Sequence, residues 1–273
     1  MAEKKTLYVS DLDGTLLNGK QIVSEFTLKT LNPLIEKGMI FSYATARSFV
    51  TASKAVEGLK SNTPIIAFNG TFILENGSGR RLTGEYFLPS ETRYILSLLT
   101  DNGVYPIVYA FIDDKEKFSF VPQMVSKEMS GFLESRKGDI RENPVTEERL
   151  LCGDVFHFVC IEAEEKLAPL YDILKEKFRC VFYRDIYTNE QWLEIHPIKA
   201  SKADGVLKLK NMLGCDRVVC FGDAANDIPM FEIADECYAT ANADERLKKI
   251  ATEVIESNEA DGVAKWLIKN AIK

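Results

Sequence analysis

Short apolar segments alternate with amphipathic segments at both ends of this 273-residue chain, and this order restricts the possible folds. The apolar runs have the length of strands and occupy residues 6–10, 39–43, 64–68 and 217–221, with a further short one near Cys237. The helical stretches between and after them are 24–38, 48–59, 202–213, 228–234 and a last one toward Lys273. Strands joined by helices predict right-handed crossovers and a parallel sheet covered on both faces. We therefore expect an α/β fold, a doubly wound, Rossmann-like core assembled from both ends of the chain.

The middle of the chain has a different pattern. A helical stretch at 89–102 is mixed with β-rich pieces at 104–112, 154–163 and 179–188. The alternation of apolar and polar residues within these β-rich pieces predicts an open, partly antiparallel sheet with helices on one face. The polar stretch 136–150 predicts a loop. We expect residues 1–84 and 189–273 to form the core domain. Residues 85–188 would then be an inserted α/β cap domain.

Composition narrows the class of protein. Hydrophobic residues make up 46% and charged residues 27%, as in ordinary globular proteins. The net charge is -7 with Lys and Arg scattered, which argues against a nucleic-acid or membrane surface. No apolar run reaches the roughly 18 residues of a membrane helix, so we expect a cytoplasmic protein. The sequence does not fix the oligomeric state, and we expect a monomer or a small homo-oligomer. The six dispersed cysteines lack a C-x-x-C pair and predict buried reduced thiols rather than zinc.

The first expected strand runs directly into DLDGT at 11–15, which places Asp11 and Asp13 just beyond its carboxyl end. Side chains two apart on an extended segment share a face, and paired buried carboxylates need a cation or a shared proton. Gly14 permits a sharp turn after them. Taken alone, this motif could equally be a solvated Asp-Gly turn.

A second acidic group follows the strand at 217–221, where GDAAND at 222–227 contains Asp223, Asn226 and Asp227. Either aspartate alone could cap a helix. Acids at two strand ends instead indicate one crevice, because ligands in parallel sheets bind beyond the carboxyl ends of the strands. Oxygen ligands without His or Cys favour magnesium over zinc.

Two further residues fit such a crevice. Thr45 and the neighbouring backbone N–H groups lie at a strand-to-helix turn, which suits phosphate oxygens. Lys202 opens the expected helix at 202–213, where its charge opposes the helix dipole. It is either held by an anionic partner or is a solvated surface lysine.

DLDGT, the threonine after the second strand, the lysine and GDAAND occur in an order that resembles the four motifs of the haloacid dehalogenase superfamily of phosphatases. The resemblance covers the whole chain. The insert between the second and third motifs is similar to that of Cof-type members with a type IIB α/β cap. SNEADGVAKWL at 257–267 and AFNG at 67–70 also resemble segments of that subfamily.

The resemblance implies a magnesium-dependent phosphatase. Asp11 would be the nucleophile that carries the phosphoryl group, and Asp13 would be the general acid and base. Magnesium would be held by the Asp11 carboxylate, the Asp13 backbone carbonyl and Asp223, with Asp227 just outside the ligand sphere.

The same resemblance assigns the groups that bind phosphate. Thr45, Lys202 and the backbone amides of Leu12 and Ala46 would hold the phosphoryl oxygens, and Asn226 would contact the phosphoryl group or the substrate. The substrate would be a small phosphorylated metabolite, such as a sugar phosphate.

The chain departs from the subfamily pattern at two positions. TAR replaces the common TGR, which puts a methyl group on Ala46, and Ala224 stands where Ser or Gly is frequent. Arg47 is therefore open to a displaced position, a substrate contact or a surface salt bridge.

Other interpretations stay open from sequence. The chain could be a sugar phosphomutase, since relatives with this cap return the phosphoryl group to sugar, or a catalytically silent regulator that binds phosphometabolites. His157, in an apolar run, is expected to be a hydrogen-bonded cap residue rather than a ligand. His196 carries no prediction, and Tyr183 is one cap tyrosine that could face the substrate.

Overall fold

The computed structural model describes residues 4–61, 63–185 and 188–271. The chain divides into two compact units, Met1–Gly84 with Ala200–Lys273 (unit 1) and Glu85–Lys199 (unit 2). Within the described residues no helix combines the length and apolar character needed to cross a membrane.

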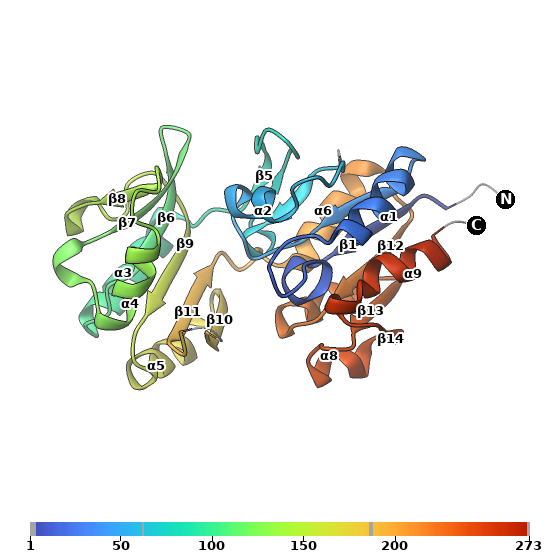
Figure 1. The fold of residues 1–273 in the computed structure, drawn as a ribbon. Helices are drawn as coiled ribbons and strands as arrows, with labels where there is room; N and C mark the ends of the chain where they lie inside the picture. Colours follow the sequence, from blue (N-terminus) through green and yellow to red (C-terminus); the bar gives the residue numbers. More distant parts are fainter. Residues whose placement is uncertain (1–3, 62, 186–187, 272–273) are drawn as a thin grey trace. The chain divides into compact units, whose positions relative to one another are not determined.

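Unit 1 contains a five-stranded parallel sheet with the order β14-β13-β12-β1-β2 (Figure 1). Its strands are β1 (Thr6–Ser10), β2 (Ile40–Tyr43), β12 (Arg217–Gly222), β13 (Glu236–Thr240) and β14 (Glu253–Ile255). Its helices are α1 (Glu25–Glu36), α2 (Phe49–Ala55), α6 (Lys202–Leu213), α7 (Ile228–Ile233), α8 (Glu245–Ile250) and α9 (Gly262–Asn270).

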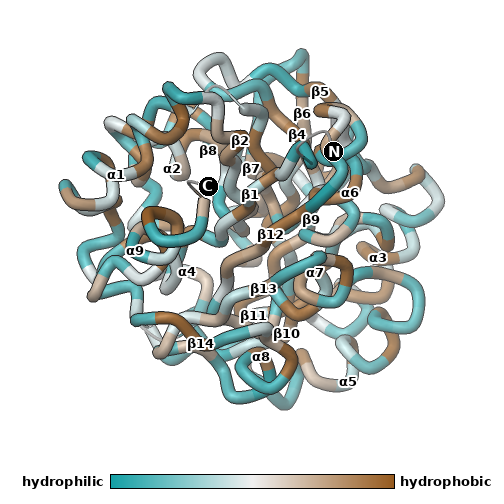
Figure 2. Tube along the Cα trace, turned by 90° about the vertical axis from the view of Figure 1, so that its right-hand side faces the viewer, coloured by the Kyte–Doolittle hydropathy of each residue, from teal (hydrophilic) through white to brown (hydrophobic). Residues whose placement is uncertain are grey.

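Helices cover both faces of this sheet. Alternate strand residues point to opposite sides, so each face buries a different set of side chains. Leu7 and Val9 belong to one buried cluster with Val206 of α6. On the other face, Phe221 and Tyr238 pack against Trp266 of α9, with ring centroids 5.2 and 4.2 Å away. The apolar colour of β12 through the interior in Figure 2 agrees with a strand buried on both sides. The doubly wound core expected from sequence is confirmed.

One expected strand of unit 1 lies in a different sheet. The apolar run at 64–68 becomes β3 (Ile65–Ala67), which forms its own antiparallel sheet with β4 (Phe72–Leu74) and β5 (Arg81–Gly84). It keeps a parallel bridge to β2 through Ala44 and Ile66, but a tight turn at 68–70 brings β4 back beside it. The expected last helix ends at Asn270, and residues 272–273 lie outside the described part.

Unit 2 is built on a six-stranded sheet with the order β10-β11-β9-β6-β7-β8. Its strands are β6 (Ile107–Ile112), β7 (Lys115–Phe120), β8 (Glu142–Pro144), β9 (Asp154–Ile161), β10 (Arg179–Arg184) and β11 (Gln191–His196). Its helices are α3 (Pro89–Asp101), α4 (Lys127–Ser135) and α5 (Glu164–Leu174). The pairs are antiparallel except β7 with β8.

The expectation of helices on one face of this sheet was wrong. Helices α3 and α5 pack on one face through residues such as Ile95 and Leu170, whereas Met129 of α4 packs with Val159 and Ile161 on the other. The polar stretch 136–150 is not wholly a loop, since β8 pairs with β7 within it. Residues 186–187 of the strand expected at 179–188 lie outside the described part.

The two units join at Gly84 and at Lys199, whereas the sequence placed the return to the core at residue 189. Strand β11 explains the difference, because it pairs with β9 and β10 on its two sides and so belongs to the sheet of unit 2.

Candidate active site

A buried lysine links two of the aspartates that the sequence singled out. Lys202, the first residue of α6, lies with its Nζ 2.6 Å from Asp11 Oδ1 and 2.6 Å from Asp227 Oδ1. The side chains are almost fully buried, at 2% exposure for Lys202, 5% for Asp11 and 0% for Asp227. Lys202 is therefore held by anionic partners and is not a solvated surface lysine.

A third carboxylate joins this group. Asp11, Asp223 and Asp227 each place an oxygen within 4.8 Å of the others, a spacing that can hold one metal ion. Asp11 follows β1 and Asp223 follows β12, and these strands are neighbours in the parallel sheet. The convergence of the two acidic strand ends expected from sequence is present.

Close backbone approaches fix the positions of these carboxylates. Gly14 adopts a φ of +73°, and a Cβ on it would overlap the Asp223 carboxylate. The Thr15 hydroxyl donates a 2.8 Å hydrogen bond to Asp223 Oδ1. The sequence analysis gave Thr15 no role, although its place in DLDGT beside the aspartates was a usable signal.

Both carboxylate oxygens of Asp227 accept hydrogen bonds from other groups of the protein. Its Oδ2 accepts hydrogen bonds from the backbone N–H groups of Asp223 and Ala224, each 3.0 Å long, while Oδ1 binds Lys202. Its acceptor capacity is thus largely used inside the protein. Asp11 and Asp223 are the better candidates for direct metal ligands, in line with the sequence expectation.

The charges of this group perturb one another. Burial, then the charges of Asp227 and Asp223, raises the pKa of Asp11 well above its ordinary value although Lys202 opposes the change. Burial and the Asp227 charge raise the pKa of Asp223 to about 6. Burial would lower the pKa of Lys202, but its two carboxylate partners raise it above its ordinary value. A single ammonium does not balance three neighbouring carboxylates.

The turn after β2 lies beside this group. Thr45 is fully buried, its N–H donates to the Ile66 carbonyl and its hydroxyl accepts a 3.1 Å bond from the Arg47 N–H. In the described part of the chain, the backbone N–H groups of Leu12 and Ala46 donate to no protein acceptor. These two amides are available to an anionic ligand.

Arg47 pairs with the second aspartate of the first motif. Its Nε lies 2.8 Å from Asp13 Oδ2 and its Nη2 lies 2.5 Å from Asp13 Oδ1, and Nη2 also donates to Gln21 Oε1. The Asp13 side chain is half-exposed. Of the alternatives open for Arg47, the structure shows an ion pair, and its partner is a candidate catalytic residue.

Asn226 is placed through another amide. Its Nδ2 donates a 3.2 Å hydrogen bond to Oδ1 of Asn69, which belongs to the AFNG segment. Asn69 was recognised in the sequence as part of a subfamily-like turn but received no role.

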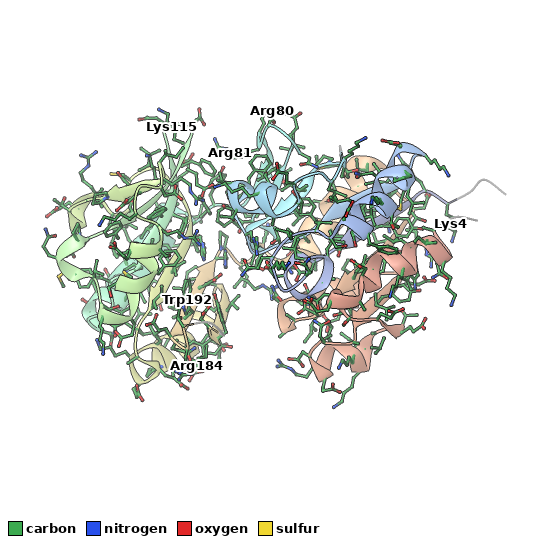
Figure 3. The ribbon with its side chains drawn as sticks, viewed as in Figure 1. Lys4, Arg80, Arg81, Lys115, Arg184 and Trp192 are labelled. Carbon is green, nitrogen blue, oxygen red and sulfur yellow. The ribbon has the colours of Figure 1, made fainter. Side chains whose placement is uncertain are left out.

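A second group of titratable residues lies in unit 2. The rings of His157 and His196 stack at 4.1 Å and 13°, and their Nε2 atoms lie 3.5 and 3.3 Å from Glu194 Oε2. The Tyr183 hydroxyl donates to Glu194 Oε1, and Trp192, labelled in Figure 3, lies on the same strand. His157, Glu194 and His196 each offer a ligand atom within 4.8 Å of the others, so this group also has a spacing that could hold a metal ion. His196 Nε2 is within hydrogen-bond distance of Glu194, whereas the 3.5 Å contact of His157 is of ion-pair type, so the expected hydrogen bond of His157 is not confirmed.

The chain is similar to known proteins along almost its whole length. It is 27% identical over 279 residues to a 5-amino-6-(5-phospho-D-ribitylamino)uracil phosphatase of Bacillus subtilis, covering 98% of each chain. A second Bacillus subtilis phosphatase with that substrate name is 26% identical over 261 residues, covering 95% of this chain and 93% of the relative.

Solved structures show the same fold. TM0651 from Thermotoga maritima superposes with a TM-score of 0.79 at 25% identity, over 99% of both chains. The subclass IIB sugar phosphatase BT4131 has a TM-score of 0.74 at 19% identity, over 98% of this chain and all of the other. The model of haloacid dehalogenase-like hydrolases matches residues 8–267. This chain therefore belongs to the haloacid dehalogenase-like hydrolase family and is a phosphatase.

Proposed function

We propose that this phosphatase is magnesium-dependent and hydrolyses phosphate monoesters of small metabolites through an aspartyl-phosphate on Asp11. The observation that supports the proposal most directly is the buried Lys202, bonded to Asp11 and Asp227 next to Asp223. This arrangement keeps one carboxylate in a fixed orientation among positive and metal-binding groups, as an in-line nucleophile requires.

The donor set fits a hard divalent cation. The ligands would be carboxylate and carbonyl oxygens, and the raised pKa values of Asp11 and Asp223 support a site that gains from added positive charge. Magnesium would be held by the Asp11 carboxylate, the Asp13 backbone carbonyl and Asp223. When bound, it would polarise a phosphoryl oxygen and offset the charge of the incoming phosphate.

The chain's own residues account for the two chemical steps. Asp13, which must first take up a proton from solvent, acts in its protonated form. A carboxylate oxygen of Asp11 attacks phosphorus, the bond from phosphorus to the leaving oxygen breaks, and Asp13 gives that oxygen its proton. Asp13 then takes a proton from the water that attacks the phosphorus of the aspartyl-phosphate. The acyl phosphate bond breaks, inorganic phosphate leaves, and both aspartates return to their starting states.

The phosphoryl oxygens need donors as charge moves between the two acids. The Leu12 and Ala46 backbone N–H groups supply two, and the Thr45 hydroxyl, Lys202 and Asn226 supply the others. Arg47 holds the Asp13 carboxylate by two hydrogen bonds, and the half-exposed position of Asp13 leaves room for it to turn toward a leaving group.

The relatives suggest the class of substrate. Two are named for a phosphate ester of a ribityl chain attached to a pyrimidine. We propose that this chain acts on phosphorylated sugars or polyols of that kind, and that unit 2, as the inserted cap domain, selects the leaving group.

The test is phosphate release from a panel of phosphorylated sugars, polyols and an aryl phosphate, with magnesium and with a chelator. We expect magnesium-dependent release by the wild type and by the matched exposed control Asp101→Asn, and none by Asp11→Asn. Acid-quenched protein should carry a phosphoryl group on the peptide that contains Asp11. Sugar isomerisation without phosphate release would instead indicate a phosphomutase, and tight phosphate-ester binding without turnover would indicate a regulator.

A further inference from the structure

The turn between β3 and β4 has an unusual backbone. Phe68, Asn69 and Gly70 are consecutive residues with positive φ, at 49°, 53° and 97°. Left-handed backbone is uncommon for residues other than glycine, and a phenylalanine there is strained. Phe68 and Asn69 are also buried, at 5% and 7% exposure. Such a conformation persists only where the surroundings impose it.

The surroundings of this turn are segments that carry the proposed phosphate-binding groups. The Asn69 N–H donates 2.9 Å to the Thr45 carbonyl, and the Phe68 N–H donates 3.1 Å to the Arg47 carbonyl. The Asn69 side chain accepts the hydrogen bond from Asn226 Nδ2. One turn thus joins the segment after β2 to the segment after β12.

The third residue of the turn meets the helix that carries the lysine. A Cβ on Gly70 would overlap the carbonyl of Ser201, the residue that caps α6 and directly precedes Lys202. Only a residue without a side chain permits this approach. The position of the turn therefore sets how closely the first turn of α6 comes to the other segments.

We infer that Asn69 and Gly70 are positioning residues of this phosphatase: they hold the Thr45 turn, Asn226 and the start of α6 in register, so that the phosphoryl-binding groups meet at Asp11. The inference rests on the proposed function of those groups. Asn69 acts through its backbone N–H and its side-chain oxygen, and Gly70 acts through its lack of a side chain.

The first test removes the Asn69 side chain and leaves the left-handed backbone conformation allowed. Asn69→Gly keeps the left-handed conformation accessible, because glycine adopts it freely. The matched control is Asn189→Gly, since Asn189 has a φ of 61° and is exposed in unit 2. We expect kcat/KM of Asn69→Gly to fall by about tenfold to a hundredfold, as for a small misplacement of reacting groups. Inhibition by orthophosphate should weaken, and Asn189→Gly should match the wild type.

The second test adds a methyl group at Gly70. The matched control is Gly77→Ala, because Gly77 has nearly the same φ, 96° against 97°, but faces open space. The backbone penalty is then common to both variants. We expect Gly70→Ala to lose far more activity per folded molecule than Gly77→Ala and to bind orthophosphate more weakly.

The readouts separate positioning from simple stability. A purely structural turn would lower the urea midpoint and leave the kcat and orthophosphate inhibition of the folded fraction unchanged. Unchanged kinetics and orthophosphate inhibition in Asn69→Gly would overturn the inference, even if Gly70→Ala does not fold. Failure of the proposed function would give a different result from failure of this inference, because the wild type itself would then release no phosphate.

Discussion

Replacing Lys202 by methionine removes the buried ionic contact between Lys202 and two aspartates of unit 1. The substitution keeps the length of the side chain and removes an ammonium that lies 2.6 Å from each of two buried carboxylates. Removing one partner of a buried ion pair costs about 3–5 kcal/mol, because the remaining charge stays buried without compensation. Uptake of a proton by Asp11, whose pKa is already raised, offsets part of this cost. We expect a net loss of about 3 kcal/mol in the magnesium-free protein.

The assay is urea unfolding followed by the fluorescence of Trp266, which packs on Phe221 and Tyr238 in unit 1. The chain has two tryptophans, so a Trp192→Phe background makes the signal specific to this unit. With a slope of roughly 2–3 kcal/mol per molar urea, the midpoint should fall by about 1 M or more.

A double variant tests the cause of that loss. Adding Asp227→Asn to Lys202→Met removes one of the two stranded charges, and the amide oxygen can still accept from the N–H groups of Asp223 and Ala224. The double variant should therefore regain about half of the lost stability. Lys249→Met, on the exposed side of α8, is the matched control and should stay within about 0.5 kcal/mol of the wild type. An unchanged midpoint for Lys202→Met, or a further loss on adding Asp227→Asn, would refute the reasoning.

Three more predictions follow from the same structure. Asp223→Asn should stabilise the metal-free protein at pH 7 by about 1–3 kcal/mol in urea unfolding, since it removes a carboxylate whose pKa is raised to about 6; equal stability of the two proteins in chelator contradicts this. Gly14→Ala should weaken magnesium binding about tenfold or more by calorimetry, because its Cβ would displace the Asp223 carboxylate; an unchanged affinity contradicts it. Burial lowers the pKa of His196 from 6.5 to about 4, so protonation favours the unfolded chain. Stability of unit 2, read from Trp192, should be complete above pH 6.5 and fall by up to about 3 kcal/mol as pH drops toward 4; equal urea midpoints at pH 7 and pH 4.5 contradict it.

The architecture of unit 1 was predictable because its sheet obeys strong general rules. Apolar strands followed by amphipathic helices leave few topologies, and acids at the carboxyl ends of neighbouring parallel strands must converge. Asp11, Asp223 and Lys202 could therefore be placed together before any coordinates were known. Their chemical roles stay predictions until the kinetic tests are made.

The details that sequence did not supply depend on side-chain rotamers and on tertiary pairing. Arg47 turns to Asp13 across 34 positions of the chain, a choice that no periodic pattern encodes. Strand β8 is short and polar, so it resembles a loop until β7 offers it hydrogen-bond partners. Helix α4 begins after the N-cap Ser126 and covers the sheet face opposite α3 and α5. Few of its apolar residues are buried, so the sequence pattern did not indicate on which face of the sheet the helix packs.

The order of strands in unit 1 also constrains how the chain is made. Strand β1 pairs with β2, close by in sequence, and with β12, which begins at residue 217. During synthesis on a ribosome, β1 has one hydrogen-bonding edge without its partner strand while more than half of the protein is synthesised. Unit 2 is contiguous and can fold during that interval. Exposure of that edge during synthesis leaves β1 open to pairing with other chains, which is a known route to aggregation.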